Sequence, residues 1–213
     1  MEMEKYKQSI GWGFIALFSV FLINAIVSRI PLEPDTMPFT IRMWWYPLSL
    51  ILQAAAVILI AFNPNSQASI LSKIGAGIYT VLILINLLNR LYSNFTGHNM
   101  LYFPGISDFG LSLVLFAPGL LLLIWGLPKY WLPAKIASTL VVVFVLTGDL
   151  LWAILANMSQ DMSNYLFQHM LNVLDILFYA DTLAKIATII LIIVWMTLRE
   201  KVPYVQPRNM NFM

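Results

Sequence analysis

Six long apolar stretches constrain this chain more than any other feature of its sequence. A helix needs about 20 apolar residues to cross roughly 30 Å of hydrocarbon, and each stretch reaches that length. Prolines fall in the breaks between them, where a missing backbone N–H does little harm. The sequence therefore predicts an all-α, polytopic integral membrane protein, a six-transmembrane-helix bundle that forms a single membrane domain over residues 1–213. The predicted spans are about 10–30, 42–62, 70–92, 108–127, 132–157 and 174–198.

The composition is that of a protein surrounded by lipid. Hydrophobic residues make up 60% of the chain and charged residues only 10%, so water cannot be the solvent for most of the folded surface. A net charge of +2 and the lack of long basic runs argue against nucleic acid as a partner. The absence of cysteine excludes disulfides and thiolate metal sites. We expect the lipid bilayer as partner and the cell (plasma) membrane as location.

The last span is predicted to continue beyond the bilayer. Its helical pattern can begin at about residue 164, which gives about 34 residues and about 51 Å of helix. This length exceeds the thickness of one bilayer. The segment "SNYLFQHMLNV" is therefore expected to lie along the membrane interface or to project from it.

The distribution of Lys and Arg predicts that both termini are cytoplasmic, by the positive-inside rule. Aromatic residues, which favour the two membrane boundaries, provide a second indication. On the inner side we place the basic residues Lys5, Lys7, Lys73, Lys129, Lys135, Arg199, Lys201 and Arg208, and the aromatic residues Trp12, Trp125, Tyr130, Trp131 and Trp195. On the outer side we place Arg29, Arg42 and Arg90, with Trp44, Trp45, Tyr46, Tyr92, Tyr102 and Trp152.

Polar residues within the spans are predicted to form one layer. Helix rise places Lys185 near the bilayer midplane and Asp181 one turn closer to the outer face. Asp149, on the preceding span, comes out at a depth close to that of Asp181. The fourth span contributes nothing stronger than Ser112, and Pro118 is expected to kink it. The remaining members of the layer are Asn24, Gln53 and Asn86 on the first three spans.

The charged members of this layer are expected to compensate one another. Each charge at a helix centre costs about 2.5–3.5 kcal/mol on insertion scales, so such groups face the bundle interior. Asp181 and Lys185 share one helical face at i, i+4, and Asp149 is expected to be a second carboxylate for the same ammonium. Two carboxylates beside one Lys leave a formal negative charge, which favours a bound proton or cation. Arg90 is expected to extend to the outer interface.

Two interpretations of the layer remain open. The first is a non-enzymatic membrane protein that binds or passes a proton, a cation or a small polar solute through Asn24, Gln53, Asn86, Asp149, Asp181 and Lys185. The second is an accessory or structural subunit of a larger membrane complex, in which the same residues only lock helices together and membrane subunits are the partners. The sequence does not specify a cofactor.

The segment "LFYADTLAKIATIIL" resembles the last helix of microbial rhodopsins, in which an Asp precedes the retinal-bearing Lys by four residues. This resemblance implies a retinal-type chromophore protein with Lys185 as the Schiff-base lysine and Asp181, with Asp149, as counter-ions. The resemblance covers some 15 residues of this chain. Those proteins have seven spans, with an Arg on the third helix and a Trp-x-x-Tyr-Pro run on the sixth. Here "RMWWYPL" has some of these residues, but on a different helix.

Other site chemistries find little support. Asp149 in "LTGD" and Asp181 in "YAD" could form an aspartyl-protease pair, but the Gly-x-Gly-Asp motif of the presenilin and prepilin-peptidase families has Leu146 at its first position here. The histidines, His98 and His169, fall at the outer edge without metal-ligand spacing. We predict neither catalytic residues nor metal ligands.

Two further patterns are expected to be structural or accidental. The "NFT" sequon at Asn94 is interpreted as a chance match. The small residues of "SKIGAG" and of the alanines at 54–56 are expected to let helices approach closely.

Overall fold

The structure is a computed structural model of the 213-residue chain that describes residues 2–29, 37–96, 108–128, 130–157 and 164–198. This part of the chain is helical and contains no β-strand, as predicted. The predictions for His98, Tyr102, Lys129, Arg199, Lys201 and Arg208 fall outside these ranges, and the side chain of Arg42 is not described. In order, the elements are α1 (Glu2–Ser28), α2 (Met37–Ala61), the short 3₁₀ helix η1 (Pro64–Ser66), α3 (Ile70–Thr96), α4 (Asp108–Leu111), the π-helical turn η2 (Ser112–Phe116), α5 (Ala117–Trp125), α6 (Leu132–Asn157) and α7 (Asn164–Thr197).

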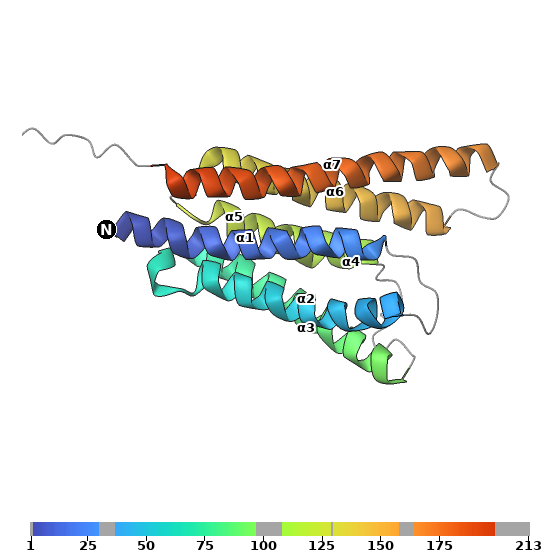
Figure 1. Ribbon diagram of the computed structural model, residues 1–213, viewed down its shortest axis with the longest axis horizontal. Coiled ribbons are helices and arrows are strands. Elements are labelled where there is room, and N and C mark those ends of the chain that lie inside the picture. The colour runs from blue at the N-terminus through green and yellow to red at the C-terminus, as the bar shows by residue number, and fades with distance from the viewer. Residues whose placement is uncertain (1, 30–36, 97–107, 129, 158–163, 199–213) are drawn as a thin grey trace, which may run out of the picture.

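Five of these helices are long and apolar enough to cross a membrane, and a shorter apolar segment runs over Ser112–Trp125. All six occur where the sequence predicts spans. The helices lie side by side with their long axes aligned (Figure 1). The arrangement fits a membrane bundle, and the chain is compatible with an integral membrane protein.

The six apolar segments form a closed ring in chain order. Packing contacts join α1 to α2, α2 to α3, α3 to α5, α5 to α6 and α6 to α7. The first and last helices, α1 and α7, also pack against each other and close the ring. In such a ring, α3 and α7 occupy opposite positions, and the inward faces of all six segments surround one central volume.

The last helix extends well past its neighbours. It is continuous over Asn164–Thr197, which is 34 residues, as the sequence predicts. In Figure 1 its first turns, in orange, project beyond the end of α6. The segment that precedes the predicted span is therefore a helical extension of it.

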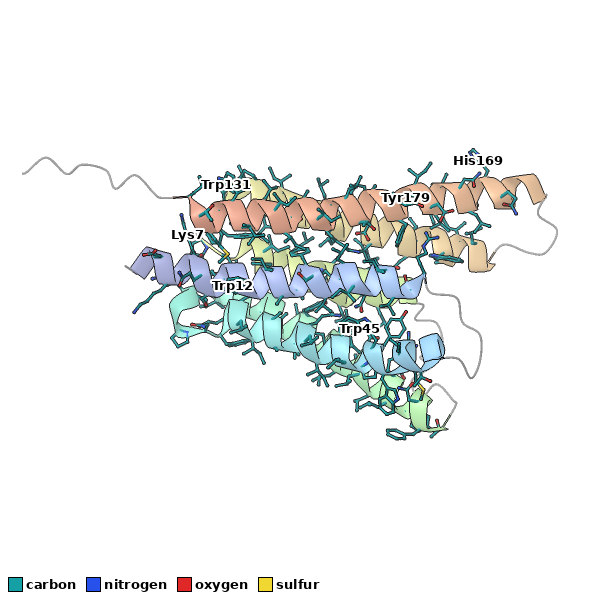
Figure 2. All side chains as sticks on the ribbon, viewed as in Figure 1. Lys7, Trp12, Trp45, Trp131, His169 and Tyr179 are labelled. Carbon is teal, nitrogen blue, oxygen red and sulfur yellow. The ribbon has the colours of Figure 1, made fainter. Side chains whose placement is uncertain are left out.

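The bundle is tightly packed at the end where α1 begins and α7 ends. Phe14 stacks on Tyr130, with ring centroids 4.7 Å apart, and the edge of Trp195 meets both Tyr6 and Tyr130. Lys7 lies in the same place (Figure 2), and its Nζ donates a hydrogen bond of 2.9 Å to the carbonyl of Leu198. A cation here satisfies a carbonyl that has no partner within the helix and complements the negative end of the helix dipole.

The aromatic residues at the predicted boundaries divide into two groups. Trp12 is 61% exposed and Trp152 is 59% exposed. Trp195 and Tyr130 are both 4% exposed and belong to the packed interior. Their rings fill the tightly packed end of the helix bundle, and the boundary depth predicted for these two residues stays a prediction.

The fourth segment is interrupted by the π-helical turn that directly precedes Pro118. The Ala117 N–H donates to the carbonyl of Ser112, five residues earlier. A proline removes an N–H and crowds the preceding turn, so the helix accommodates it by widening. The distortion predicted at Pro118 is therefore present, as a π turn.

A second proline, Pro47, lies inside α2. It cannot donate to the carbonyl of Met43, four residues earlier. The side chain of Asn94 in α3 takes that place, since its Nδ2 donates to the Met43 carbonyl at 3.2 Å. The amide of the "NFT" sequon thus has a structural role between two helices.

Candidate functional site

The ring of helices encloses a cavity of about 1000 Å³, to which all six apolar segments contribute lining residues. The cavity occupies the half of the bundle opposite the closed end, because its lining takes the later turns of α1, α3 and α6 and the earlier turns of α2 and α7. The structure brings together every residue of the predicted polar layer on its wall: Asn24, Gln53, Asn86, Asp149, Asp181 and Lys185.

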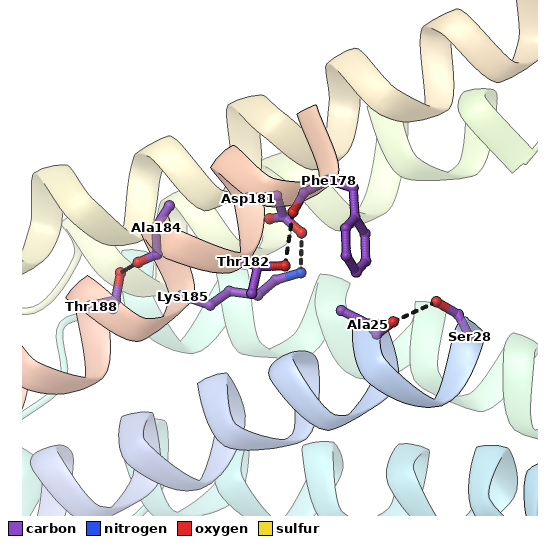
Figure 3. A network of polar contacts seen from close by, with 8 residues as sticks. All are labelled: Ala25, Ser28, Phe178, Asp181, Thr182, Ala184, Lys185 and Thr188. Atoms are coloured by element: carbon purple, nitrogen blue, oxygen red, sulfur yellow. Dashed lines mark hydrogen bonds and ion pairs between the residues drawn. The ribbon is translucent and has the colours of Figure 1, made fainter. Parts of the chain in front are cut away.

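The deep end of the cavity carries an ion pair on α7. The ammonium of Lys185 donates a hydrogen bond to Oδ2 of Asp181, one turn earlier. The two side chains are only 6% and 13% exposed. Figure 3 shows the Lys185 side chain running along α7 towards Asp181, on the side of the helix that faces α1. The i, i+4 spacing read from the sequence produces this pair directly.

The second oxygen of this carboxylate has no partner. Among the buried polar side-chain atoms of the described ranges, only Oδ1 of Asp181 lacks a hydrogen bond. Buried carboxylate oxygens are almost always satisfied, and leaving one unpaired in low-dielectric surroundings is costly. An additional donor or a proton at this oxygen would remove that cost.

One face of α7 supplies much of the cavity wall. Leu171, Leu174, Phe178, Asp181 and Lys185 recur at intervals of three or four residues and all line the cavity, as does Asp175 beside Leu174. This spacing puts them on a single helical face. Beyond Lys185 the same face continues with Thr188, Ile192 and Trp195, which are buried in the closed end.

The amides of the first two spans form hydrogen bonds between helices. Gln53 in α2 accepts a hydrogen bond of 2.6 Å from the hydroxyl of Tyr79 in α3. Asn24 in α1 accepts one of 2.7 Å from the indole N–H of Trp45 in α2. These two amides therefore connect neighbouring helices while they line the cavity. Asn86, one turn before Arg90 on α3, also lies on the wall.

Further charged residues lie at the open end of the cavity. Arg29, directly after α1, donates to Oδ1 of Asp175 on α7 at 2.7 Å, and both side chains are about half exposed, at 52% and 54%. The Arg29 guanidinium also lies 4.1 Å from the centre of the Phe178 ring. This ion pair joins the first and last helices at the rim, and the sequence analysis missed it.

Arg90 belongs to the cavity as well. Its guanidinium lies over the ring of Tyr46, 4.9 Å from the ring centre, and both residues line the wall. The sequence analysis left Arg90 out of the site, and its expected extension to the outer interface stays a prediction. Its position on the face of α3 that carries Tyr79, Leu82 and Asn86, all at helical spacing, was the signal that could have identified it.

Asp149 lines the cavity from α6, together with Gly148 and Trp152. The ion pair that the structure shows for Lys185 is with Asp181, and the pairing predicted between Lys185 and Asp149 stays a prediction. The place of Asp149 on the cavity wall agrees with its membership of the predicted polar layer.

The formal charges of the cavity wall balance. Its basic residues are Arg29, Arg90 and Lys185, and its acidic residues are Asp149, Asp175 and Asp181. The sequence analysis counted one negative charge in excess because it left Arg29, Arg90 and Asp175 out of the site. With all six included, the wall carries opposite charges in equal number.

Metal-binding groups do not gather in the described ranges, where no cluster of three His, Cys, Asp or Glu residues is placed to hold an ion. His169 lies near the projecting end of α7, far from the closed end (Figure 2). Comparison of the chain with protein-family models, with curated proteins and with solved structures found no match.

Proposed function

We propose that this chain is a non-enzymatic, six-span protein of the cell membrane whose central cavity binds or passes a proton, a cation or a small polar solute. The observation that carries the proposal is the cavity itself. A volume of about 1000 Å³ is bordered by Asn24, Gln53, Asn86, Asp149, Asp181 and Lys185. Ionisable groups inside a membrane protein mark ion, proton or ligand sites by default.

The size of the cavity favours this function over a purely structural one. Residues that only lock helices together are surrounded by other side chains, because protein interiors are closely packed. Here the Asp181–Lys185 pair lies beside open volume, and one carboxylate oxygen has no partner. A subunit that merely holds helices together would need neither feature.

We propose that the closed end of the ring faces the cytoplasm, with both termini on that side. Lys5, Lys7, Lys73 and Lys135 all stand in the first turns of helices that begin at that end. The open end carries Arg29 and Arg90. Positive residues concentrate on the cytoplasmic side of membrane proteins, so the cavity would open to the outside.

Reconstitution into liposomes tests the transport form of this proposal. The parent protein should give a proton, cation or solute flux, and Asp149→Asn and Asp181→Asn should each abolish it. Thr182→Val is the matched control, because the Thr182 hydroxyl donates to the Phe178 carbonyl within α7 and does not line the cavity. If the parent shows neither flux nor binding, and the Asp variants lose only thermal stability, the proposal is wrong and the role of partner-holding subunit takes its place.

One observation also favours a second candidate, a retinal-type chromophore protein. Lys185 is deeply buried, borders a cavity of suitable size and has a carboxylate partner, and a desolvated lysine suits imine chemistry. The purified protein should then show a visible absorption band that borohydride bleaches and that Lys185→Ala lacks. A colourless protein that stays colourless when retinal is added would remove this candidate.

A further inference from the structure

We infer that the ligand of the cavity is a zwitterionic organic molecule, with an ammonium group and an anionic group separated by several ångströms. This inference rests on the proposed function and narrows it, because it excludes the proton and the bare cation as the main ligand. A free solute or a zwitterionic lipid headgroup could supply these two charged groups.

The volume of the cavity indicates an organic ligand. At about 1000 Å³, the cavity lies at the upper end of the range for sites that hold small molecules, about 300–1000 Å³. An inorganic ion needs only the few ligand atoms around it. Aromatic side chains that would pack against an organic molecule also line the wall: Phe21, Tyr46, Phe116, Phe144, Trp152 and Phe178.

The charge balance indicates a ligand without net charge. The wall carries three basic and three acidic residues, namely Arg29, Arg90, Lys185, Asp149, Asp175 and Asp181. A singly charged ligand would therefore bring an uncompensated charge into a low-dielectric volume, which is expensive. A zwitterion keeps the sum at zero and can pair each of its ends.

The two ends of the ligand have different places. Arg90 on α3 offers its guanidinium on the wall, with the Asn86 amide one turn deeper, and a guanidinium pairs readily with a carboxylate or a phosphate. Asp181 on α7 offers a carboxylate oxygen without a partner, which an ammonium group would satisfy. Lys185 remains on the other oxygen of the same carboxylate.

The ring geometry separates these two places. α3 and α7 stand on opposite sides of the ring. Neighbouring helix axes lie about 8–10 Å apart, so opposite axes in a ring of six are about 16–20 Å apart. Side chains reach inward from both sides and shorten this gap, which leaves several ångströms for the ligand to bridge. An ω-amino acid has this shape.

The test is a binding assay on the full-length protein in nanodiscs of phosphatidylglycerol. The probes are ω-amino acids from 3-aminopropionate to 8-aminooctanoate. The tightest of them is compared with the alkanoate that lacks its amine and the alkylamine that lacks its carboxylate. Sodium and potassium are titrated separately. Charged hydrogen bonds contribute about 1.5–3 kcal/mol, so the zwitterion should bind at least about tenfold more tightly than either analogue.

Two variants assign the ends of the ligand. In Arg90→Gln the zwitterion should bind no more tightly than the alkylamine. In Asp181→Asn the zwitterion should bind no more tightly than the alkanoate. Lys73→Gln, on α3 outside the cavity, and Thr182→Val, on α7 beside Asp181, are the matched controls and should bind as the parent does. Because Asp181→Asn leaves the Lys185 charge without its partner, Asp181→Glu, which keeps that charge, is measured with it and should retain the preference.

The outcomes separate this inference from the proposed function. If the alkylamine, sodium or potassium binds as tightly as every zwitterion, the inference is overturned while the proposed function stands. If no probe and no cation binds the parent, the inference is overturned, and the proposed function fails with it only if the liposomes also show no proton, cation or solute flux. A second nanodisc that contains phosphatidylethanolamine identifies the source: competition with the soluble zwitterion points to a lipid headgroup, and unchanged binding points to a free solute.

Discussion

The hydroxyl of Tyr79 in α3 donates a hydrogen bond of 2.6 Å to the side-chain oxygen of Gln53 in α2, and both residues are buried at the cavity wall. The bond fixes two neighbouring helices at the depth where open volume gives way to packed side chains. It also satisfies two polar groups that would be costly to bury alone.

Tyr79→Phe should destabilise the protein by about 1–3 kcal/mol, because the Gln53 oxygen then has no donor. The double variant Tyr79→Phe with Gln53→Leu should recover part of this loss, since neither polar group remains. Thermal unfolding in detergent measures both effects. Thr80→Val is the control, because the Thr80 hydroxyl only donates to the Ala76 carbonyl in its own helix. Equal stability of Tyr79→Phe and the parent would contradict a role for this bond.

The buried ion pair should show strong coupling between its two members. Lys185→Met or Asp181→Asn alone leaves a polar or charged group without compensation, and breaking a buried pair costs about 3–5 kcal/mol. The double variant should be more stable than Lys185→Met alone. A double-mutant cycle on unfolding free energies gives the coupling energy. Additive losses in this cycle would show that the two side chains do not depend on each other.

Two glycines in α3 should respond in opposite ways to the same change. A Cβ on Gly75 would lie 2.4 Å from the backbone nitrogen of Leu123, whereas a Cβ on Gly77 would meet nothing within 4 Å. Gly75→Ala should therefore force α3 and α5 apart and lower the melting temperature. Gly77→Ala should be neutral or stabilise by up to about 1 kcal/mol through helix propensity. Equal melting temperatures of the two variants would show that α3 and α5 are not in close contact at Gly75.

The hydrogen bond at the closed end should hold the last turn of α7. Lys7→Met removes the donor to the Leu198 carbonyl and the favourable charge at the helix end, a loss of about 0.5–2 kcal/mol. Hydrogen exchange should then speed up in the last turn of α7. Lys5→Met is the control, because Lys5 is exposed. Unchanged exchange in the Lys7 variant would show that the contact contributes nothing to local stability.

The proposed orientation can be tested because the chain contains no cysteine. Gln168→Cys in α7 and Gln8→Cys in α1 introduce single thiols at exposed positions near opposite ends of the bundle. In intact cells a membrane-impermeant maleimide should label Cys at 168 and not at 8. The reverse pattern would place both termini outside, and labelling of both would indicate leaky cells, which a cytoplasmic marker protein detects.

The sequence predicted the features that depend on distance along one helix. The positions of the apolar helical segments, the full length of α7 and the pairing of Asp181 with Lys185 follow from hydropathy, helix rise and i, i+4 spacing. The same arithmetic grouped Asn24, Gln53, Asn86 and Asp149 in one polar layer, and all of them line the cavity.

The features that depend on rotation or on distant partners could not be predicted in this way. Whether Asp149 faces Lys185, and whether Arg90 turns towards lipid or towards Tyr46, depends on how each helix is rotated by its neighbours. The contact of Arg29 with Asp175 joins residues at opposite ends of the sequence. The burial of Trp195 likewise depends on side chains from other helices, which hydropathy does not specify.

The junction between α1 and α7 differs from the other junctions of the ring. Each of the others joins helices that follow one another in the chain, so a connecting segment limits how far they can separate. α1 and α7 are instead held at their two ends by Arg29 with Asp175 and by Lys7 with the Leu198 carbonyl. Because no loop ties α1 to α7, this junction is held only by its side-chain contacts, and it can separate only if the packing of Tyr6 on Trp195 is lost together with both end contacts.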